Sequence, residues 1–275
     1  QILGKLSENR PVLAVAGTHG KTTTSTLLAH LLHTGKIPVE AFLGGISLGE
    51  GSNLLMAGRG QDRPWMVAEA DEYDRSFLTL HPTCAAITSV DADHLDIYGT
   101  HEQMLKAFVQ FSTQVEQGGL LWHSDVVLPL QKTTEKGMDL LPEIYGKLAP
   151  KSTLSDHGWA AGYSEVGPHN ASGEAKARFE LHLRGQAPME VLWRMPGPHN
   201  AANATAAAYL ACRAGMEPEA IPAALAAFPG VARRFEIKYR SGGKAVIDDY
   251  AHHPTEVEGA IAAARQTFPG QRITG

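Results

Sequence analysis

The sequence contains only two cysteines in 275 residues, and Cys84 and Cys212 lie far apart in apolar or alanine-rich surroundings. This spacing suits neither a metal site nor a redox pair, so both are expected to be small core residues in a reducing cytosol. No apolar run approaches the roughly 20 residues that span a bilayer, and no charged-then-apolar leader opens the chain. We therefore expect a cytoplasmic protein without a membrane partner.

An excess of positive charge is also missing. The formal net charge is −5 at pH 7, which gives no support for nucleic-acid binding as the main function. Hydrophobic residues make up 43% of the sequence, enough for the core of one large domain or two ordinary ones.

The most informative segment that is present is VLAVAGTHGKTTT, residues 12–24. An apolar run predicts a strand, Gly17 and Gly20 predict a turn, and a helix is expected to begin near Thr22. Such a turn points backbone N–H groups and the positive helix end at an anion. Lys21 is then expected to reach the β- and γ-phosphates of a nucleotide, and Thr22 to bind Mg²⁺.

This loop departs from the standard G-x-x-x-x-G-K-[ST] pattern, because Val15 stands where that pattern has glycine. The alternative is a Gly-rich strand-to-helix turn in which Lys-Thr is incidental. The strand before the loop and the helix after it favour the nucleotide interpretation.

A second polar group follows the apolar run WMVAEADEYD, residues 65–74. The run places Glu69 at the carboxyl end of a strand, where α/β proteins assemble their sites, and carboxylates are ligands that Mg²⁺ prefers. Repulsion among Asp71, Glu72 and Asp74 requires a cation, arginine or water to relieve it. A solvated acidic loop is the alternative.

A third group is SVDADHLDIYG, residues 89–99, also at the end of an apolar run. His94 lies among Asp91, Asp93 and Asp96, and an imidazole nitrogen among carboxylates can complete a divalent-metal site. A structural histidine is the alternative, which the two other strand-end groups make less favoured.

Two later segments place polar groups near helix starts. Asn200 and Asn203 follow a Pro-Gly-Pro stop and are close enough to share one helix face, although Asn200 also suits an N-cap. In VIDDYAHHPTE, residues 246–256, several ionisable side chains follow a strand before Pro254 opens a helix. Arg234 lies between these segments and could neutralise transferred phosphate.

The order of elements predicts an α/β fold: a P-loop-type, mainly parallel sheet flanked by helices, with an antiparallel hairpin extension and an incomplete Rossmann-like C-terminal domain. We expect a central domain over 1–230 and the beginning of a second domain over 231–275. The expected strands are 12–16, 65–68, 84–90, 120–123, 177–184, 189–195, 236–239, 244–247 and one opening at 272. The expected helices are 22–33, 101–115, 200–214, 218–228 and 256–266, with the end of another before residue 10; residues 133–151 show no clear pattern.

Six segments occur together and in order: GTHGKTTT, EADE, DADH, HN with Asn203, GVARRFE and DDYAHHPTE. In this combination the chain resembles the Mur ligases, the ATP-dependent amide-forming enzymes of peptidoglycan synthesis, over essentially its whole length. The resemblance implies a three-domain enzyme of which this chain holds the central ATPase domain and the opening of the C-terminal domain, so that the chain alone is expected to be inactive.

The resemblance also implies a reaction. A muramate carboxylate attacks the γ-phosphate of ATP to give an acyl phosphate, and an amine then displaces phosphate. His19, DADHLDIYG and the RRFE and DDYAHHPTE pair favour the members that join L-alanine to UDP-N-acetylmuramate. No nucleophilic Ser or Cys arrangement is visible, and this mechanism needs none.

Residue roles follow from the same resemblance. The groups expected to act in catalysis are Lys21, His94, Arg234 and His252. The residues expected to contact ATP are Gly17, Thr18, His19, Gly20, Lys21, Thr22, Thr23, Asn200, Asn203, Arg234 and Asp249. Mg²⁺ is expected on Thr22, Glu69 and His94. The residues expected near the other substrates are Gly44, Gly45, Ser52 and Asn53, in a loop facing the UDP-sugar, and Tyr250 and His252, beside the amino acid.

Two alternatives remain open. Tyr73 stands where a small residue is more typical of the alanine-adding members, and the family member that recycles cell-wall tripeptide also has tyrosine there. A nucleotide-binding switch NTPase is the alternative of another class, but it predicts a guanine-selecting N/T-K-x-D segment, which the sequence lacks. The oligomeric state is not determined by the sequence.

Overall fold

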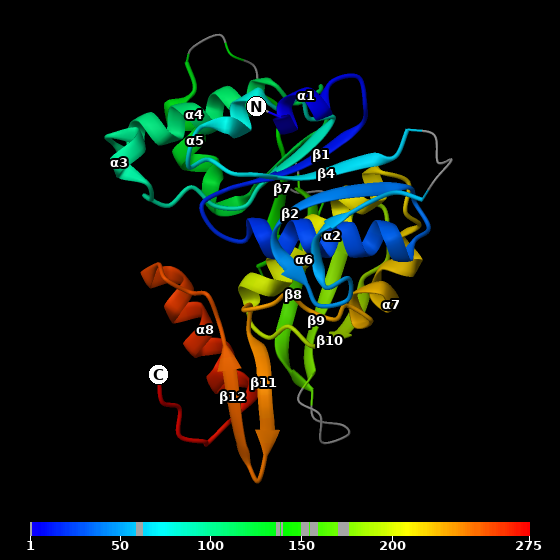
Figure 1. Cartoon of the computed structure of the whole chain (residues 1–275), viewed down its shortest axis with the longest axis vertical. Coiled ribbons are helices and arrows are strands. Elements are labelled where there is room, and N and C mark those ends of the chain that lie inside the picture. Colours follow the sequence, from blue (N-terminus) through cyan, green and yellow to red (C-terminus); the bar gives the residue numbers. More distant parts are fainter. Residues whose placement is uncertain are drawn as a thin grey trace.

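The computed structural model describes residues 2–58, 63–135, 138, 140–149, 154, 159–169 and 176–275. Its main feature is a ten-stranded sheet in the order β10-β9-β8-β7-β6-β5-β1-β4-β2-β3 (Figure 1). The strands are β1 Val12–Ala16, β2 Val39–Ser47, β3 Ser52–Leu55, β4 Trp65–Ala70, β5 Cys84–Ile87, β6 Leu120–His123, β7 Glu143–Lys147, β8 Trp159–His169, β9 Lys176–Leu183 and β10 Met189–Trp193.

The middle of the sheet is parallel. β1 pairs with β4 on one side and with β5 on the other, and the parallel series continues through β6, β7 and β8. Every residue of β1 is buried, as expected for a strand covered on both faces by helices. Because parallel strands share a direction, the carboxyl ends of β1, β4 and β5 lie at the same edge, where ligands bind in α/β sheets.

Helices cover both faces of this sheet (Figure 1). They are α1 Ile2–Ser7, α2 Lys21–Thr34, α3 Leu95–Tyr98, α4 His101–Thr113, α5 Val127–Thr133, α6 Pro198–Arg213 and α7 Ile221–Ala226, with short 3-10 helices at Ser76–Thr79, Ser124–Val126 and Pro218–Ala220. One buried cluster joins α2, α6 and α7 to the sheet, and a second joins α4 and α5 to its other face. Alternate residues of β1 contribute to each, since successive strand side chains point to opposite faces.

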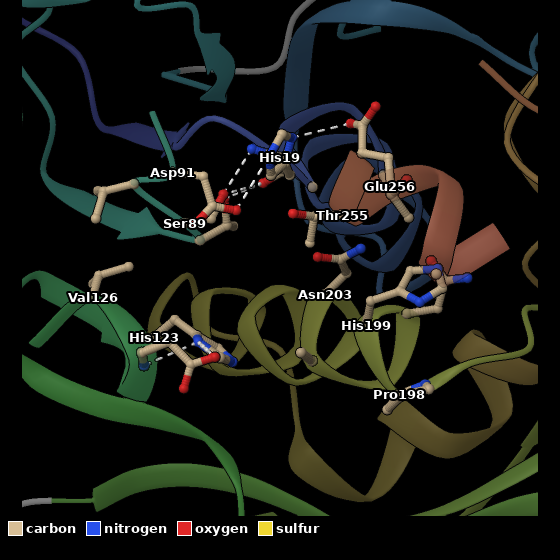
Figure 2. Close-up of a pocket in the computed structure, with 18 of the residues that line it drawn as sticks. His19, Ser89, Asp91, His123, Val126, Pro198, His199, Asn203, Thr255 and Glu256 are labelled. Carbon is tan, nitrogen blue, oxygen red and sulfur yellow. Dashed lines mark hydrogen bonds and ion pairs between the residues drawn. The ribbon is translucent and has the colours of Figure 1, made fainter. Parts of the chain in front are cut away.

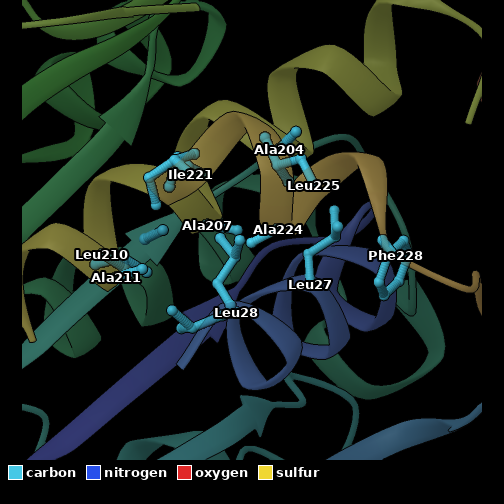
Figure 3. Packing of buried hydrophobic residues seen from close by; sticks show 14 of the residues in the cluster. Leu27, Leu28, Ala204, Ala207, Leu210, Ala211, Ile221, Ala224, Leu225 and Phe228 are labelled. Carbon is cyan, nitrogen blue, oxygen red and sulfur yellow. The ribbon is translucent and has the colours of Figure 1, made fainter. Parts of the chain in front are cut away.

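The packing of α2 against α6 fixes the position of the phosphate loop. Leu27 and Leu28 of α2 meet small side chains of α6, including Ala204 and Ala207, all of which are buried (Figure 3). Small residues on one helix let the two axes approach closely. The start of α2, which follows the phosphate loop directly, is thereby held beside the start of α6.

A smaller unit follows α7. It consists of the antiparallel pair β11 Glu236–Ser241 and β12 Lys244–Asp248, followed by α8 Pro254–Thr267. A separate small cluster around Phe235, Ala263 and Ala264 packs α8 against this pair.

Most expectations about the elements are confirmed. The α/β class, the mainly parallel sheet and its antiparallel hairpin of β9 and β10 are all observed. The strands at 12–16 and 120–123 have the predicted bounds. The predicted helices are all observed, and their ends differ from the predicted ones by a few residues. No helix in the described part of the chain is long and apolar enough to cross a membrane.

The strand expected from Arg272 is wrong: residues 272–275, all of them described, form no strand, and the small sheet has only β11 and β12. A strand needs a hydrogen-bonded neighbour, and this segment has none there. Conversely, the sequence interpretation missed β2, β3, β8 and α5, and it missed β7 in the stretch 133–151, of which residues 136, 137, 139, 150 and 151 lie outside the described residues.

Candidate active site

The loop between β1 and α2 has the geometry of a phosphate loop. Gly17 and Gly20 have positive φ angles of 131° and 82°, which favour glycine. A Cβ on Gly17 would lie 2.2 Å from Thr88 Oγ1, and one on Gly20 would lie 2.6 Å from Asn203 Oδ1. The loop therefore lies against neighbouring elements too closely for a side chain, and α2 begins immediately afterwards at Lys21.

Lys21 is held by a carboxylate at this edge of the sheet. Its Nζ lies 2.7 Å from the Gly17 carbonyl oxygen and 3.0 and 2.8 Å from the two carboxylate oxygens of Glu72. The Glu72 side chain is completely buried, and burial is the largest cause that raises its pKa, opposed by the charge and hydrogen bond of Lys21. Lysine thus provides the cation that the repulsion within the acidic segment was predicted to require.

His94 lies next to this ion pair. Its Nε2 is 3.8 Å from Glu72 Oε1 and 3.6 Å from Asp93 Oδ2, and the Tyr73 ring packs edge-on at 5.0 Å between centroids. Tyr98 donates a hydrogen bond of 2.6 Å to the Glu72 carbonyl oxygen, which fixes the backbone of the acidic segment.

Thr22 and Glu69 come together as the sequence predicted. The Thr22 hydroxyl donates to Glu69 Oε1 at 2.9 Å, and the other carboxylate oxygen accepts from the Gly44 backbone N–H at 2.7 Å. Ser25 adds a longer hydrogen bond of 3.3 Å to the same carboxylate. A hydroxyl and a carboxylate side by side are hard oxygen donors of the kind that Mg²⁺ takes, so these residues fit that ion.

A cavity of about 480 Å³ opens beside the phosphate loop (Figure 2). Its volume lies in the range of small-molecule sites. Its walls come from the phosphate loop, the end of β5, the start of α6 and the smaller C-terminal unit, and include His19, Gly20, Thr23, Ser89, Asn200, Asn203, Arg234, Asp249 and Glu256. The cavity is therefore formed by both parts of the chain.

The predicted residues of α6 lie in this cavity wall, with their polar groups directed differently. Asn200 donates to the Pro196 carbonyl oxygen at 2.7 Å, whereas the Asn203 side chain lies against Gly20. The neighbouring His199 keeps an exposed surface, but desolvation by the groups packed around its ring lowers its pKa, which favours the neutral ring.

The Thr18 hydroxyl contacts the segment that follows β5. Its Oγ1 lies 3.0 Å from Ser89 Oγ and accepts from the Asp91 backbone N–H at 3.0 Å. These contacts join the phosphate loop to the DADH segment.

The C-terminal residues are brought partly to the site. Arg234 and Asp249 line the cavity, and Asp249 accepts from the backbone N–H groups of Phe235 and Ala251, both at 2.8 Å. Tyr250 lies under the Arg233 and Arg234 guanidinium groups at 4.7 and 5.5 Å, and His252 is exposed.

The residues expected in a loop facing the UDP-sugar lie in strands instead, so the prediction of a loop is wrong. Gly44 and Gly45 lie within β2, and Ser52 and Asn53 lie within β3 at the sheet edge. A Cβ on Gly45 would lie 2.6 Å from Thr22 Cγ2, so both glycines stand next to the Thr22 and Glu69 pair. Ser52 instead accepts from the Leu54 backbone N–H.

Three further residues were not singled out for a role by sequence reasoning. Glu72 belongs to the predicted acidic segment, yet its pairing with Lys21 needs the loop and β4 side by side. Ser89 binds both backbone groups of His19, and Glu256 hydrogen-bonds the His19 ring. The only sequence signal for Glu256 is its place at the third position of α8, which suits a capping carboxylate.

Two protein-family models match most of the chain. The family model described as the Mur ligase middle domain matches residues 15–211, and that of the Mur ligase glutamate ligase domain matches residues 233–275. A protein of Cytophaga hutchinsonii named UDP-N-acetylmuramate--L-alanine ligase is 36% identical over 274 residues, which is 99% of this chain and 55% of that protein. The chain thus spans about half the length of the curated relatives it matches.

Two solved structures are similar throughout. The UDP-N-acetylmuramate-alanine ligase of Thermotoga maritima superimposes with a TM-score of 0.74 at 28% identity, covering 95% of this chain and 55% of that one. A murein peptide ligase of Psychrobacter arcticus gives a TM-score of 0.71 at 27% identity, covering 98% of this chain and 58% of that one.

Proposed function

We propose, given that this chain belongs to the Mur ligase family, that it is the ATP-binding part of a ligase joining L-alanine to UDP-N-acetylmuramate in peptidoglycan precursor synthesis. The observation that carries the proposal is the meeting of Lys21, Thr22 and Glu69 at the carboxyl edge of the sheet, beside a cavity of nucleotide size. The names of the curated relatives support the choice of L-alanine.

The proposed roles follow from what each side chain can do. Lys21 leaves Glu72 to neutralise charge on the γ-phosphate, while Thr22 and Glu69 hold one Mg²⁺ and His94 holds a second. Arg234 neutralises phosphate from the C-terminal side of the cavity. Positioning and charge neutralisation are the main protein contributions to phosphoryl transfer, so this set of side chains suits the step.

The nucleotide and the other substrates contact further residues around this centre. The phosphate-loop residues with Asn200, Asn203 and Asp249 bind ATP, which supplies the γ-phosphate that activates the muramate carboxylate. Tyr250 and His252 face the amino acid, and Gly45, Ser52 and Asn53 belong to the side that receives the UDP-sugar. We further propose a domain boundary at residues 230 and 231 and a cytoplasmic location.

The experiment that tests this function measures phosphate release by the complete gene product with Mg-ATP and UDP-N-acetylmuramate. Release that depends on added L-alanine is the expected result. In the variant Glu69→Gln, phosphate release should fall because a proposed Mg²⁺ ligand is lost. The matched control is Glu8→Gln, at an exposed position just after α1, where release should not change. Release that is independent of any amine would favour a plain nucleotidase and contradict the proposal.

Attachment of the cell-wall tripeptide is the second candidate. Tyr73, the residue that departs from the alanine-adding pattern, packs directly on His94 and is 48% exposed, so it can contact a substrate. The similarity to the murein peptide ligase supports the same possibility. Release that depends on the tripeptide and not on L-alanine would establish this candidate.

Replacing Gly44 with alanine is expected to raise the Mg²⁺ concentration needed for activity by about tenfold, as for other changes behind a metal ligand. The added Cβ would lie 2.3 Å from Glu69 Oε1, so the carboxylate must move away from Thr22. Gly167→Ala is the matched control, because a Cβ there meets nothing within 4 Å among the residues that the structure describes. An Mg²⁺ titration in which the two variants behave alike would refute this prediction.

A further inference from the structure

The His19 imidazole connects the phosphate loop to the smaller C-terminal unit. Its Nδ1 lies 3.2 Å from Glu256 Oε1 at the start of α8, and its Nε2 lies 3.3 Å from Asp91 Oδ2 after β5 (Figure 2). His19 and Glu256 are 237 positions apart in the sequence. The ring of His253, which precedes α8, also stacks near His19, with 4.5 Å between ring centroids.

This contact is largely shielded from water. The side chains of His19 and Glu256 are 13% and 15% exposed, whereas Asp91 is 48% exposed. The Nε2 atom of His19 is buried without a hydrogen-bond partner in the described part of the chain, so the bond from Nδ1 to Glu256 is the ring's hydrogen bond there. A charge-assisted hydrogen bond that is mostly buried stabilises more than an exposed ion pair.

On the C-terminal side, the two carboxylate oxygens of Glu256 make different hydrogen bonds. Its Oε2 accepts from the His252 backbone N–H at 3.2 Å and fixes the chain entering α8, while Oε1 reaches His19. Burial alone would raise the pKa of Glu256, but the hydrogen bonds from His19 and from the His252 backbone lower it to about 2. The carboxylate is therefore charged throughout the physiological range.

On the other side, the backbone of His19 is fixed to the main sheet. Its N–H donates to Ser89 Oγ at 2.7 Å, and its carbonyl oxygen accepts from the hydroxyls of Thr88 and Ser89. These backbone bonds hold the phosphate loop, and with it the His19 imidazole, in a fixed position on the main sheet. A helix bonded to that imidazole is held against the loop itself.

We propose that Glu256 is a positioning residue that fastens the start of α8 to the phosphate loop through His19. In this arrangement Thr255, Glu256 and Gly259 of α8 line the same cavity as Asn203 of α6. The bond keeps the two parts of the chain assembled around the nucleotide cavity before nucleotide binds. Its consequence for nucleotide affinity rests on the proposed function, whereas the bond itself does not.

Hydrogen exchange of the nucleotide-free complete gene product tests the bond. In Glu256→Gln and in His19→Leu, amides of both α8 and the phosphate loop are expected to exchange about tenfold faster, since a hydrogen bond to a charged group is lost. The matched controls are Glu258→Gln on the same helix and His33→Leu at the end of α2, both at exposed positions. His19→Leu leaves the cap of α8 intact, so it separates fastening from capping.

The double variant Glu256→Gln with His19→Leu is expected to exchange no faster than Glu256→Gln alone, because both changes remove the same bond between α8 and the phosphate loop. Additive effects, or faster exchange confined to the part of the chain that carries the change, would overturn the proposal. A titration with Mg-ADP separates this outcome from failure of the proposed function. Wild-type protein that binds no Mg-ADP contradicts the function, whereas binding that is equally tight in Glu256→Gln and Glu258→Gln contradicts the role of the bond in assembling the cavity.

Discussion

Alanine in place of Lys21 is expected to lower the turnover of the complete gene product by at least about 10²- to 10³-fold, the loss typical for removing one preorganised group that stabilises transition-state charge. Lys21 Nζ is the ammonium group within the phosphate loop, and it is held by the Gly17 carbonyl oxygen and by Glu72 in the nucleotide-free arrangement. Steady-state phosphate release with saturating substrates measures the effect.

The matched control for this prediction is Lys5→Ala, at an exposed position of α1. It makes the same chemical change away from the sheet edge and should leave turnover unchanged. Turnover of Lys21→Ala within a few-fold of the wild type would contradict the assignment of the phosphate loop.

A second large effect is expected on stability. Changing Lys21 to methionine keeps most of the side-chain stem but leaves the completely buried carboxylate of Glu72 without its cation. Breaking one partner of a buried ion pair costs about 3 kcal/mol in the free energy of unfolding. Urea-induced unfolding in metal-free buffer measures this cost. The double variant Lys21→Met with Glu72→Gln should recover most of it, and a single variant as stable as the wild type would show that the pair is not important for stability.

The same variant should acquire a pH dependence. Burial raises the pKa of Glu72, and the charge and hydrogen bond of Lys21 oppose this, so the pKa rises further when Lys21 is lost. The folded state then holds a proton that the unfolded chain, with a glutamate pKa of about 4.3, has released. Stability of Lys21→Met should therefore increase as the pH falls through the raised pKa of Glu72 in the folded state towards its unfolded value. The wild type should show a weaker trend of the same sign, and the double variant none from this group.

Sequence reasoning was most successful where the signal is local. The apolar run of β1, the glycines of the loop and the start of α2 are consecutive, and their backbone preferences do not depend on the rest of the chain. The alternation of short apolar runs with helical segments likewise predicted a mainly parallel sheet, and the carboxyl ends of β1, β4 and β5 then had to share one edge. Because Thr22 follows β1 and Glu69 lies near the end of β4, the two residues were expected to lie near each other.

Sequence reasoning was weaker where a strand lacks a distinctive pattern. β2 contains Gly44 and Gly45 in its middle, which is typical of a turn, whereas the structure uses both glycines because β2 passes close to Glu69 and Thr22. The expected strand at Arg272 shows the opposite error, since an apolar or β-favouring start does not form a strand without a partner.

The sequence by itself determined the phosphate loop, the α/β class and the set of ionisable groups at the strand ends, because backbone preference and hydrophobic periodicity are properties of neighbouring residues. Only the tertiary structure decided which group meets which. Lys21 pairs with Glu72, while Glu69 takes Thr22 and the Gly44 amide, and His19 reaches Glu256 across 237 positions. These pairings depend on side-chain direction and on the packing of α2, α6 and α8 around one cavity, and no local pattern contains that information.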